Sequence, residues 1–402
     1  MGIGDWGLGK AENVPIYHQL GTVPPKRHVV FRQPGGALYT EELIGNKGFS
    51  GPSSLVYHVH QPTQVLRVEP LGEISWVADD LPAFRHRHFR TARLQPRASF
   101  IKDRVPLLFN GNVAMSFVEP TLDDPHYYRN AQGDELVYVS DGAGVLESPL
   151  GDIAFRRGDY LVIPRGIMYR LRFSERPARC LVIESAGYIR TPARYRNEHG
   201  QLTEMAPFSE RDIRRPSGLR TFDEHGEFTV LVKKSNRLTS LTVDHHPFDV
   251  VGWDGYYYPW AFNINDFEPR VGRLHLPPPV HQTFEGDGFV VCSFCPRPYD
   301  FDPEAVPVPY NHSNVMSDEV LYYASTEFMS RKGIEYGSVT LHPDGVPHGP
   351  HPGRTEAALG QTRTDELAVM LDTFHPLKVA AAALPIEDRD YHRSWIETAR
   401  TS

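Results

Sequence analysis

Residues 312–319 read His312-Ser313-Asn314-Val315-Met316-Ser317-Asp318-Glu319, and an earlier stretch, Tyr128–Glu135, reads Tyr-Arg-Asn-Ala-Gln-Gly-Asp-Glu. Aligned without a gap, the two stretches share their asparagine, aspartate and glutamate, and Tyr138 then falls on Tyr322. Stretches that recur within one chain indicate a structural unit used more than once. We therefore predict that the chain contains two copies of one fold.

A second shared stretch lies downstream of the first in each copy. Gly158 followed by Pro164–Tyr169 aligns with Gly337 followed by Pro343–His348, again without a gap. Glycine and proline at these places predict a tight turn. We expect the turn to aim its last side chain, Tyr169 or His348, toward the first motif of the same copy.

The composition favours strands and turns over long helices. The 402 residues include 35 prolines and 33 glycines, and 11% of them are aromatic. Between residues 99 and 185, short apolar runs alternate with turn residues such as Asn110-Gly111, a hairpin signal. Short strands at this spacing predict antiparallel barrels or jelly rolls.

The paired motifs resemble those of the cupin barrel. The resemblance implies an all-β bicupin, that is, two jelly-roll β-barrels with an irregular N-terminal arm and few short helices. We predict three segments. They are residues 1–98, an arm with strands that pack on the barrels; residues 99–240, an N-terminal cupin-like barrel without a metal site; and residues 241–402, a C-terminal catalytic barrel with a terminal helix at Trp395–Ala399.

The two copies differ where a metal would bind. His312 and His348 of the C-terminal copy are replaced by Tyr128 and Tyr169 in the N-terminal copy. Two histidines and one carboxylate on one side of a metal leave positions open for dioxygen and substrate, as in non-haem Fe(II) oxygenases. We predict one metal per chain, held by His312, Glu319 and His348. The alternative, three unrelated side chains among 19 histidines, is disfavoured because both histidines occur in one copy alone.

A narrower resemblance is to the homogentisate 1,2-dioxygenase family. It is carried by Gly36–Leu43, Phe248–Trp253, Val280-His281, Pro309–His312 and Pro347–Pro350, in the order and approximate spacing of that family. It implies a dioxygenase with one Fe(II) per chain that converts homogentisate and O2 to 4-maleylacetoacetate in tyrosine and phenylalanine catabolism.

The same resemblance implies roles for individual residues. His312, Glu319 and His348 match the iron ligands, and His281 matches the proposed acid/base histidine. Histidine suits proton transfer because its charge changes near neutral pH. The resemblance further implies a homo-oligomer, either a trimer or a hexamer.

The identity of the carboxylate ligand has two candidates. In better-known members the carboxylate stands six residues after the histidine, which is the place of Asp318, and Glu319 is one residue later. We prefer Glu319 because the internal repeat pairs it with Glu135, and we keep Asp318 as the alternative.

Four further residues are candidates for contacts with an aromatic substrate. Tyr310 lies beside His312, and Asn314 follows on the same predicted strand face. His342 precedes the second motif and could instead orient a metal ligand or pack at the end of a strand. His351 follows His348 and is expected near the pocket entrance.

Other features exclude some classes of function. The net charge of −8 and the lack of a basic run argue against nucleic-acid binding. No signal peptide or membrane-spanning run is visible, so we expect a cytoplasmic protein without a membrane partner. Cys180, Cys292 and Cys295 predict buried strand residues rather than disulfides. The His-x-His pairs at His58 and His86 are expected to be structural.

Two rival functions stay open. A relative within the same family could open another hydroquinone, a gentisate-like acid or an aminophenol. A protein of another class would be a cupin that binds or isomerises a small molecule without consuming oxygen.

Overall fold

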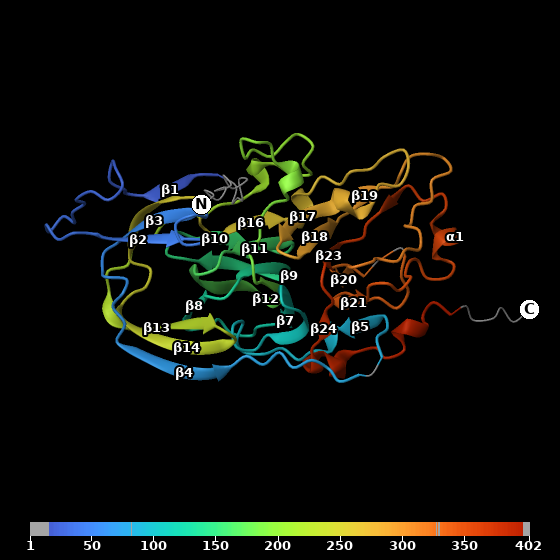
Figure 1. Ribbon diagram of the computed structural model, residues 1–402, viewed down its shortest axis with the longest axis horizontal. Coiled ribbons are helices and arrows are strands. Elements are labelled where there is room, and N and C mark those ends of the chain that lie inside the picture. Colours follow the sequence, from blue (N-terminus) through green and yellow to red (C-terminus); the bar gives the residue numbers. More distant parts are fainter. Residues whose placement is uncertain (1–15, 82, 327, 329, 397–402) are drawn as a thin grey trace, which may run out of the picture.

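The computed structural model describes residues 16–396 apart from 82, 327 and 329, and these form an almost entirely β protein (Figure 1). Within this range the one α-helix is α1 (Arg354–Ala358). The other helical segments are short 3-10 helices: Thr91–Arg93, Ala193–Tyr195, Glu210–Asp212, Ile264–Asp266, Pro278–His281, Ala381–Ile386 and Tyr391–Arg393. The all-β prediction is confirmed.

The N-terminal barrel is built on the antiparallel pair β9 and β12. Leu136, Val137, Tyr138 and Val139 of β9 are all buried, because strands and core cover both faces. The twelve-stranded sheet has the order β16-β11-β9-β12-β8-β13-β14-β4, with β6, β7, β10 and β24 attached. Its strands are β4 (Arg67–Glu73), β6 (Val105–Phe109), β7 (Val113–Val118), β8 (Tyr127–Asn130), β9 (Asp134–Glu147), β10 (Ile153–Phe155), β11 (Asp159–Ile163), β12 (Met168–Ser185), β13 (His225–Lys234), β14 (Arg237–His245), β16 (Trp260–Asn263) and β24 (Lys378–Val379).

The C-terminal barrel is built on a six-stranded sheet of order β17-β18-β23-β20-β21-β5. Its strands are β5 (Arg87–Arg90), β17 (Gln282–Gly286), β18 (Phe289–Phe294), β20 (Asp318–Tyr323), β21 (Ser338–His342) and β23 (Ala368–Thr373). Figure 1 shows β5, from the N-terminal segment, beside β21 among strands of the C-terminal end. Strands β19 (Arg297–Pro298) and β22 (Arg363–Thr364) form a separate pair.

A four-stranded sheet, β1-β15-β3-β2, lies at the other end of the molecule (Figure 1). Its strands are β1 (His18–Gly21), β2 (Thr40–Gly45), β3 (Ser53–His58) and β15 (Val250–Gly255). β15 and β16 come from the segment predicted to begin the C-terminal barrel, and they pair with β1, β3 and β11. The division of the chain at residues 98 and 240 stays a prediction. Strands from each predicted segment pair with strands from another segment.

The two halves share one hydrophobic core. Tyr138 and Tyr322, which the internal repeat aligns, are both fully buried, and their ring centroids lie 6.0 Å apart. The Tyr322 hydroxyl donates to Ser140 Oγ at 2.7 Å. Equivalent positions of the two copies therefore meet where the barrels pack.

The two copies of the repeat have the same backbone contacts. Tyr128 is paired with Tyr169 in the N-terminal barrel, and His312 is paired with His348 by an isolated bridge in the C-terminal barrel. The first and second motifs of each copy are therefore neighbours, as the sequence predicted.

A glycine closes the turn of each second motif. The Gly166 amide donates to the Asn130 carbonyl at 2.8 Å, and the Gly345 amide donates to the Asn314 carbonyl at 2.6 Å. Gly166 has φ 84° and Gly345 has φ 71°, in the left-handed region that favours glycine. Glycine recurs here because the turn needs this conformation.

Three smaller predictions concern single segments. Most of the predicted terminal helix lies outside the described residues, and Trp395 and Ile396 form a turn after the 3-10 helix Tyr391–Arg393. The three cysteines are buried and unpaired, as expected. No helix of the described part of the chain is long and apolar enough to cross a membrane.

Candidate metal centre

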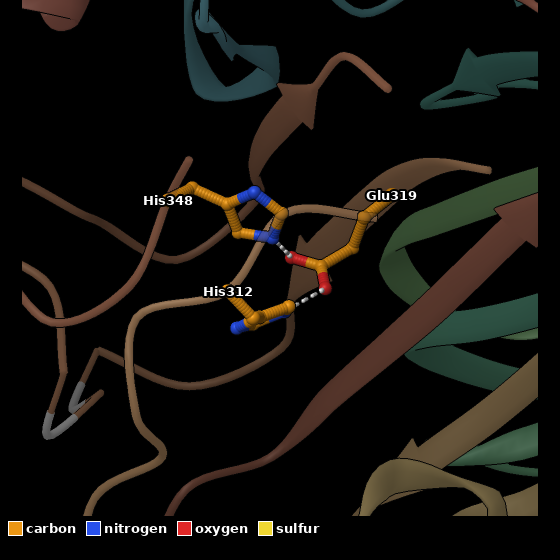
Figure 2. Close-up of side chains that lie close together, drawn as sticks. All are labelled: His312, Glu319 and His348. Atoms are coloured by element: carbon orange, nitrogen blue, oxygen red, sulfur yellow. Dashed lines mark ion pairs between the residues drawn. The ribbon is translucent and has the colours of Figure 1, made fainter. Parts of the chain in front are cut away.

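His312, Glu319 and His348 converge at one end of the C-terminal barrel. Glu319 lies on β20, and the two histidines come from the loops that precede β20 and follow β21. One nitrogen of each imidazole and one oxygen of the carboxylate all lie within 4.8 Å of one another. Figure 2 shows both rings beside the carboxylate, with His312 Nε2 3.6 Å from Oε2 and His348 Nε2 3.4 Å from Oε1.

The chemistry of these side chains fits a divalent metal. Glu319 and His348 are 6% and 2% exposed, and His348 Nε2 is buried without a hydrogen-bond partner among the described residues. A buried polar atom without a partner is costly, and coordination to a metal would satisfy it. Two imidazoles and one carboxylate are the donor set of facial Fe(II) sites.

Backbone carbonyls orient both imidazoles. His312 Nδ1 donates to the Tyr310 carbonyl at 3.1 Å, and His348 Nδ1 is 3.3 Å from the Val346 carbonyl. A proton held on Nδ1 leaves the Nε2 lone pair free to bind a metal. Both Nε2 atoms face Glu319.

His342 orients the carboxylate. It lies directly opposite Glu319 in the β20–β21 register, and its Nδ1 is 2.7 Å from Glu319 Oε1. Its Nε2 is 3.3 Å from the Tyr391 hydroxyl. Burial lowers the pKa of His342 to about 3 in spite of the carboxylate, so the ring is uncharged near neutral pH. Its contacts are with protein groups rather than with the cavity.

Burial and neighbouring charges act on two carboxyl groups of the centre. Burial alone would raise the pKa of Glu319, but its interactions with the His312, His342 and His348 rings outweigh it and hold that pKa well below its usual value. Asp372 lies opposite Glu319 in the β20–β23 register, and burial together with the Glu319 charge raises the pKa of Asp372 to about 8. These effects favour the ionised form of Glu319 and the protonated form of Asp372.

Asp318, the alternative ligand, has both oxygens occupied. They accept hydrogen bonds from the backbone amides of Asp344 at 2.8 Å and Leu377 at 2.6 Å. Asp134 of the N-terminal copy accepts from two amides in the same way, at 2.8 and 2.9 Å. The aspartate of the repeat therefore ties together the ends of each barrel, whereas Glu319 faces the histidines.

In the N-terminal barrel an arginine side chain lies where the C-terminal barrel has its histidine cluster. Arg104 Nη1 donates to Glu135 Oε1 at 2.5 Å, and Nη2 donates to the Tyr169 hydroxyl at 3.2 Å. The Tyr169 hydroxyl in turn donates to Glu135 Oε2 at 2.6 Å. A guanidinium therefore neutralises the glutamate in this copy, and tyrosines replace both histidines.

A cavity of about 110 Å³ opens beside His312 and Glu319. His281 lies in its wall with 5% exposure, and its Nδ1 has no hydrogen-bond partner in the described structure. Burial, together with the charges of Arg297 and His275, lowers the pKa of His281 to about 3. The ring is therefore neutral and can accept a hydrogen bond from a ligand. The apolar part of the wall includes Phe294, Leu321, Phe328 and Met370.

Three other predicted substrate contacts lie outside this wall. Tyr310 is 63% exposed and borders a neighbouring cavity with Asn311 and Pro350. Asn314 is half-buried at the repeat turn. His351 is buried, with Nδ1 accepting from the Lys332 amide at 2.6 Å and Nε2 3.0 Å from Ser394 Oγ. Their role as substrate contacts stays a prediction.

Two residues of the centre, Arg331 and Asp372, were not predicted from the sequence. Arg331 lies in the cavity wall, and Asp372 is the strand neighbour of Glu319. A comparison of the two copies could have indicated Asp372, because an acidic residue, Glu184, pairs with Glu135 at the equivalent place in the N-terminal barrel. Arg331 follows a loop whose path depends on tertiary packing, and no motif marks it.

Comparison with known proteins identifies the family. The family model described as the N-terminal part of homogentisate 1,2-dioxygenase matches residues 110–264. A protein from Saccharolobus solfataricus, named "Putative dioxygenase", is 42% identical over 388 residues, covering 94% of this chain and 99% of that protein. The homogentisate 1,2-dioxygenase of Rhodopseudomonas palustris strain HaA2 is 25% identical over 350 residues, covering 81% of this chain and 74% of that enzyme.

The chain belongs to the homogentisate 1,2-dioxygenase family. The resemblance stated from the motifs is thereby confirmed. Among solved structures, a glyoxylate-induced protein from Pseudomonas aeruginosa matches 79% of this chain and 96% of its own, with 11% identity and a TM-score of 0.36. A cupin 2 barrel protein from Leptotrichia buccalis has a TM-score of 0.33 with 9% identity, covering 74% of this chain and 99% of that protein. The family assignment depends on the sequence relatives and not on these distant structures.

Proposed function

We propose that this chain is an Fe(II)-dependent ring-cleaving dioxygenase that converts homogentisate and O2 to 4-maleylacetoacetate. The observation that carries the proposal is the cluster of His312, Glu319 and His348 at the edge of a cavity whose wall holds an uncharged histidine. The family membership supports the same reaction class. We further propose one iron per chain, held by these three side chains.

A bound Fe(II) would bring the ring oxygens and dioxygen side by side and stabilise the charge that develops on them. The protein residues would prepare the site for this. His342 holds the Glu319 carboxylate in place, and the Tyr310 and Val346 carbonyls direct the two imidazoles. His281 Nδ1 would accept a hydrogen bond from a ring hydroxyl and so assist its deprotonation, since it is buried, uncharged and without another partner among the described residues.

Two alternatives remain part of the proposal. The relative with 42% identity is named only as a dioxygenase, so another hydroquinone, a gentisate-like acid or an aminophenol could replace homogentisate. A cupin that binds or isomerises a small molecule without oxygen is the alternative of another class. A homo-oligomer, a place in tyrosine and phenylalanine catabolism and a cytoplasmic location stay predictions.

Anaerobic reconstitution with Fe(II), followed by homogentisate and oxygen, tests the proposal. We expect one O2 consumed per homogentisate and a ring-opened product identified by mass. His348→Ala should lose iron and turnover, whereas Tyr169→Phe, at the equivalent place in the N-terminal barrel, should keep both. Oxygen uptake with gentisate or an aminophenol but not with homogentisate would contradict the substrate, and full activity of His348→Ala would contradict the site.

A further inference from the structure

Arg331 is a buried cation in the wall of the cavity. It lies in the segment between β20 and β21 and is 6% exposed. It borders the cavity together with His312, Glu319 and Phe328. Its Nη1 donates to the carbonyl of Gly349, the residue after His348, so it lies close to the cluster.

The guanidinium of Arg331 has few partners for a buried charge. Nη1 donates to the Gly349 carbonyl, Nε is buried without a partner among the described residues, and the Trp395 ring centroid lies 5.7 Å from Cζ. The Tyr323 hydroxyl is a further hydrogen-bond partner, and the Glu319 charge acts on the guanidinium from beyond ion-pair distance. No carboxylate of the described residues lies within the 4.0 Å of an ion pair with it. A buried charge is costly unless an opposite charge or a full set of hydrogen bonds compensates it.

Two other arginines whose side chains are largely buried have carboxylate partners. Arg297, in the wall of the same cavity, donates to Glu366 Oε1 at 2.6 Å, and Arg104 of the other barrel donates to Glu135 at 2.5 Å. Arg331 differs from both because no carboxylate of the described residues lies at ion-pair distance from it, and Glu319 acts on it only from farther away. A divalent ion beside Glu319 would add positive charge to the same cavity, and an anionic ligand would compensate both.

We propose that Arg331 binds the carboxylate of the substrate, so that the enzyme selects aromatic diols that carry an acidic side chain. The inference rests on the proposed function and extends it to the part of the ligand that does not react. A guanidinium presents parallel N–H donors that match the two oxygens of a carboxylate. Binding the acid at Arg331 would place the ring between this residue and the His312–Glu319–His348 cluster.

A purely structural role is the competing explanation. Gly349 follows His348, and its carbonyl accepts from both Arg331 and Trp395 Nε1, the latter at 3.1 Å. Loss of Arg331 could therefore shift His348. A structural effect would weaken all ligands equally, whereas loss of a carboxylate partner affects only ligands with a carboxylate.

The test compares 2,5-dihydroxyphenylacetate with its methyl ester, which keeps the ring hydroxyls and lacks the charge. Dissociation constants are measured anaerobically by calorimetry on the Fe(II)-loaded protein. We expect Arg331→Met to weaken binding of the acid on the order of 100-fold and binding of the ester less than about threefold. Arg331→Lys should recover part of the affinity for the acid, because lysine restores the positive charge but lacks the parallel N–H donors of a guanidinium. Arg363→Gln is the matched control, since Arg363 is exposed and pairs with Asp365.

Three results would overturn the inference: equal weakening of acid and ester, unchanged affinity of Arg331→Met for the acid, or a wild-type protein that binds the acid no more tightly than the ester. Iron content, measured on every variant, should stay at the wild-type level. Failure of the proposed function gives a different result, the absence of oxygen uptake by the wild-type enzyme with every ring substrate. Binding does not require turnover, so the two failures are distinguishable.

Discussion

Two adjacent acidic residues, Asp318 and Glu319, have different tasks because neighbouring side chains on a strand point to opposite faces. Asp318 accepts two backbone amides, and Glu319 faces three imidazoles. The same division holds for Asp134 and Glu135, where the aspartate accepts two amides and the glutamate faces Arg104. At the scale of single residues, the aspartate of each pair therefore holds backbone amides, whereas the glutamate faces side chains at the end of the barrel.

This separation predicts opposite effects of two conservative changes. Glu319→Gln should abolish stoichiometric Fe(II) binding, because an amide is a weak metal ligand, and should leave the fold intact. Asp318→Asn should keep the metal and lower the free energy of unfolding by about 1–3 kcal/mol, since its amide nitrogen cannot accept the second backbone amide. Metal analysis and urea unfolding check both effects.

Asp134→Asn is the matched control for this pair. It removes the same two-amide contact from the barrel without the histidine cluster, so its stability loss should resemble that of Asp318→Asn with no change in iron content. Loss of iron from Asp318→Asn with retention by Glu319→Gln would reverse the assignment.

At the scale of elements, His58 links strands of the four-stranded sheet. It lies at the end of β3, with Nδ1 2.7 Å from Asp249 Oδ1 and Nε2 3.1 Å from Glu42 Oε2 on β2. Burial by itself would lower the pKa of His58, but the two carboxylates outweigh it and raise that pKa to about 9. The His-x-His pair at this position therefore has a structural environment.

The raised pKa predicts a pH-dependent stability. A histidine whose pKa is higher in the folded state stabilises fully below its unfolded pKa of about 6.5 and loses this contribution as the pH rises through about 9. In urea unfolding, His58→Gln should be less stable than wild type near pH 6 by on the order of 3 kcal/mol, and most of the difference should vanish by pH 10. His28→Gln removes an exposed His28–Glu41 pair and should change stability by less than about 1 kcal/mol at either pH. An equal deficit of His58→Gln at pH 6 and pH 10 would refute the assignment.

At the scale of the whole molecule, the N-terminal segment completes the C-terminal barrel. β5 is the outermost strand beside β21, and its Arg87 forms two hydrogen bonds with Glu387 and one with Asp79. Arg85 also reaches Glu387, whose side chain is 1% exposed. Residues far apart in the sequence thus hold the sheet on which Glu319 and His342 lie.

Arg87→Met should therefore disturb both the fold and the metal site. We expect a loss of about 3 kcal/mol in unfolding free energy, because the change leaves buried acidic groups without their main partner. Iron retention during dialysis should fall in parallel. Arg67→Met is the control: Arg67 also makes two hydrogen bonds with a glutamate, Glu227, but on an exposed surface, so the change should cost far less stability than Arg87→Met. Equal effects of the two changes would contradict this account.

The repeat made much of the centre predictable from the sequence. Both copies must build the same turn and the same amide contacts, so Asn130, Asp134, Gly166 and their partners in the second copy stay alike. Because these residues are the same in both copies, the difference at Tyr128 and Tyr169, which are histidines in the second copy, indicates where the cluster lies. The fold class followed from the same pattern.

Contacts between distant segments were less predictable. β5 is four residues long and carries charged residues on both sides of Phe89, so nothing in its sequence indicates that it joins β21. β15 and β16 have ordinary strand patterns that do not indicate which sheet each of them joins. The burial of Arg331 depends on how its loop folds over the barrel, and residue type alone favours an exposed position.

Both barrels can be viewed as holding a positive charge at one equivalent point. In the C-terminal half that charge would be an ion in exchange with the medium, and in the N-terminal half it is Arg104, attached to the polypeptide. A chelator could withdraw the first and has no access to the second. In the N-terminal barrel the Arg104 guanidinium compensates Glu135 at this point, and we expect the apoprotein to remain folded and able to bind the ion again. Loss of the proposed iron would then inactivate the protein reversibly rather than unfold it.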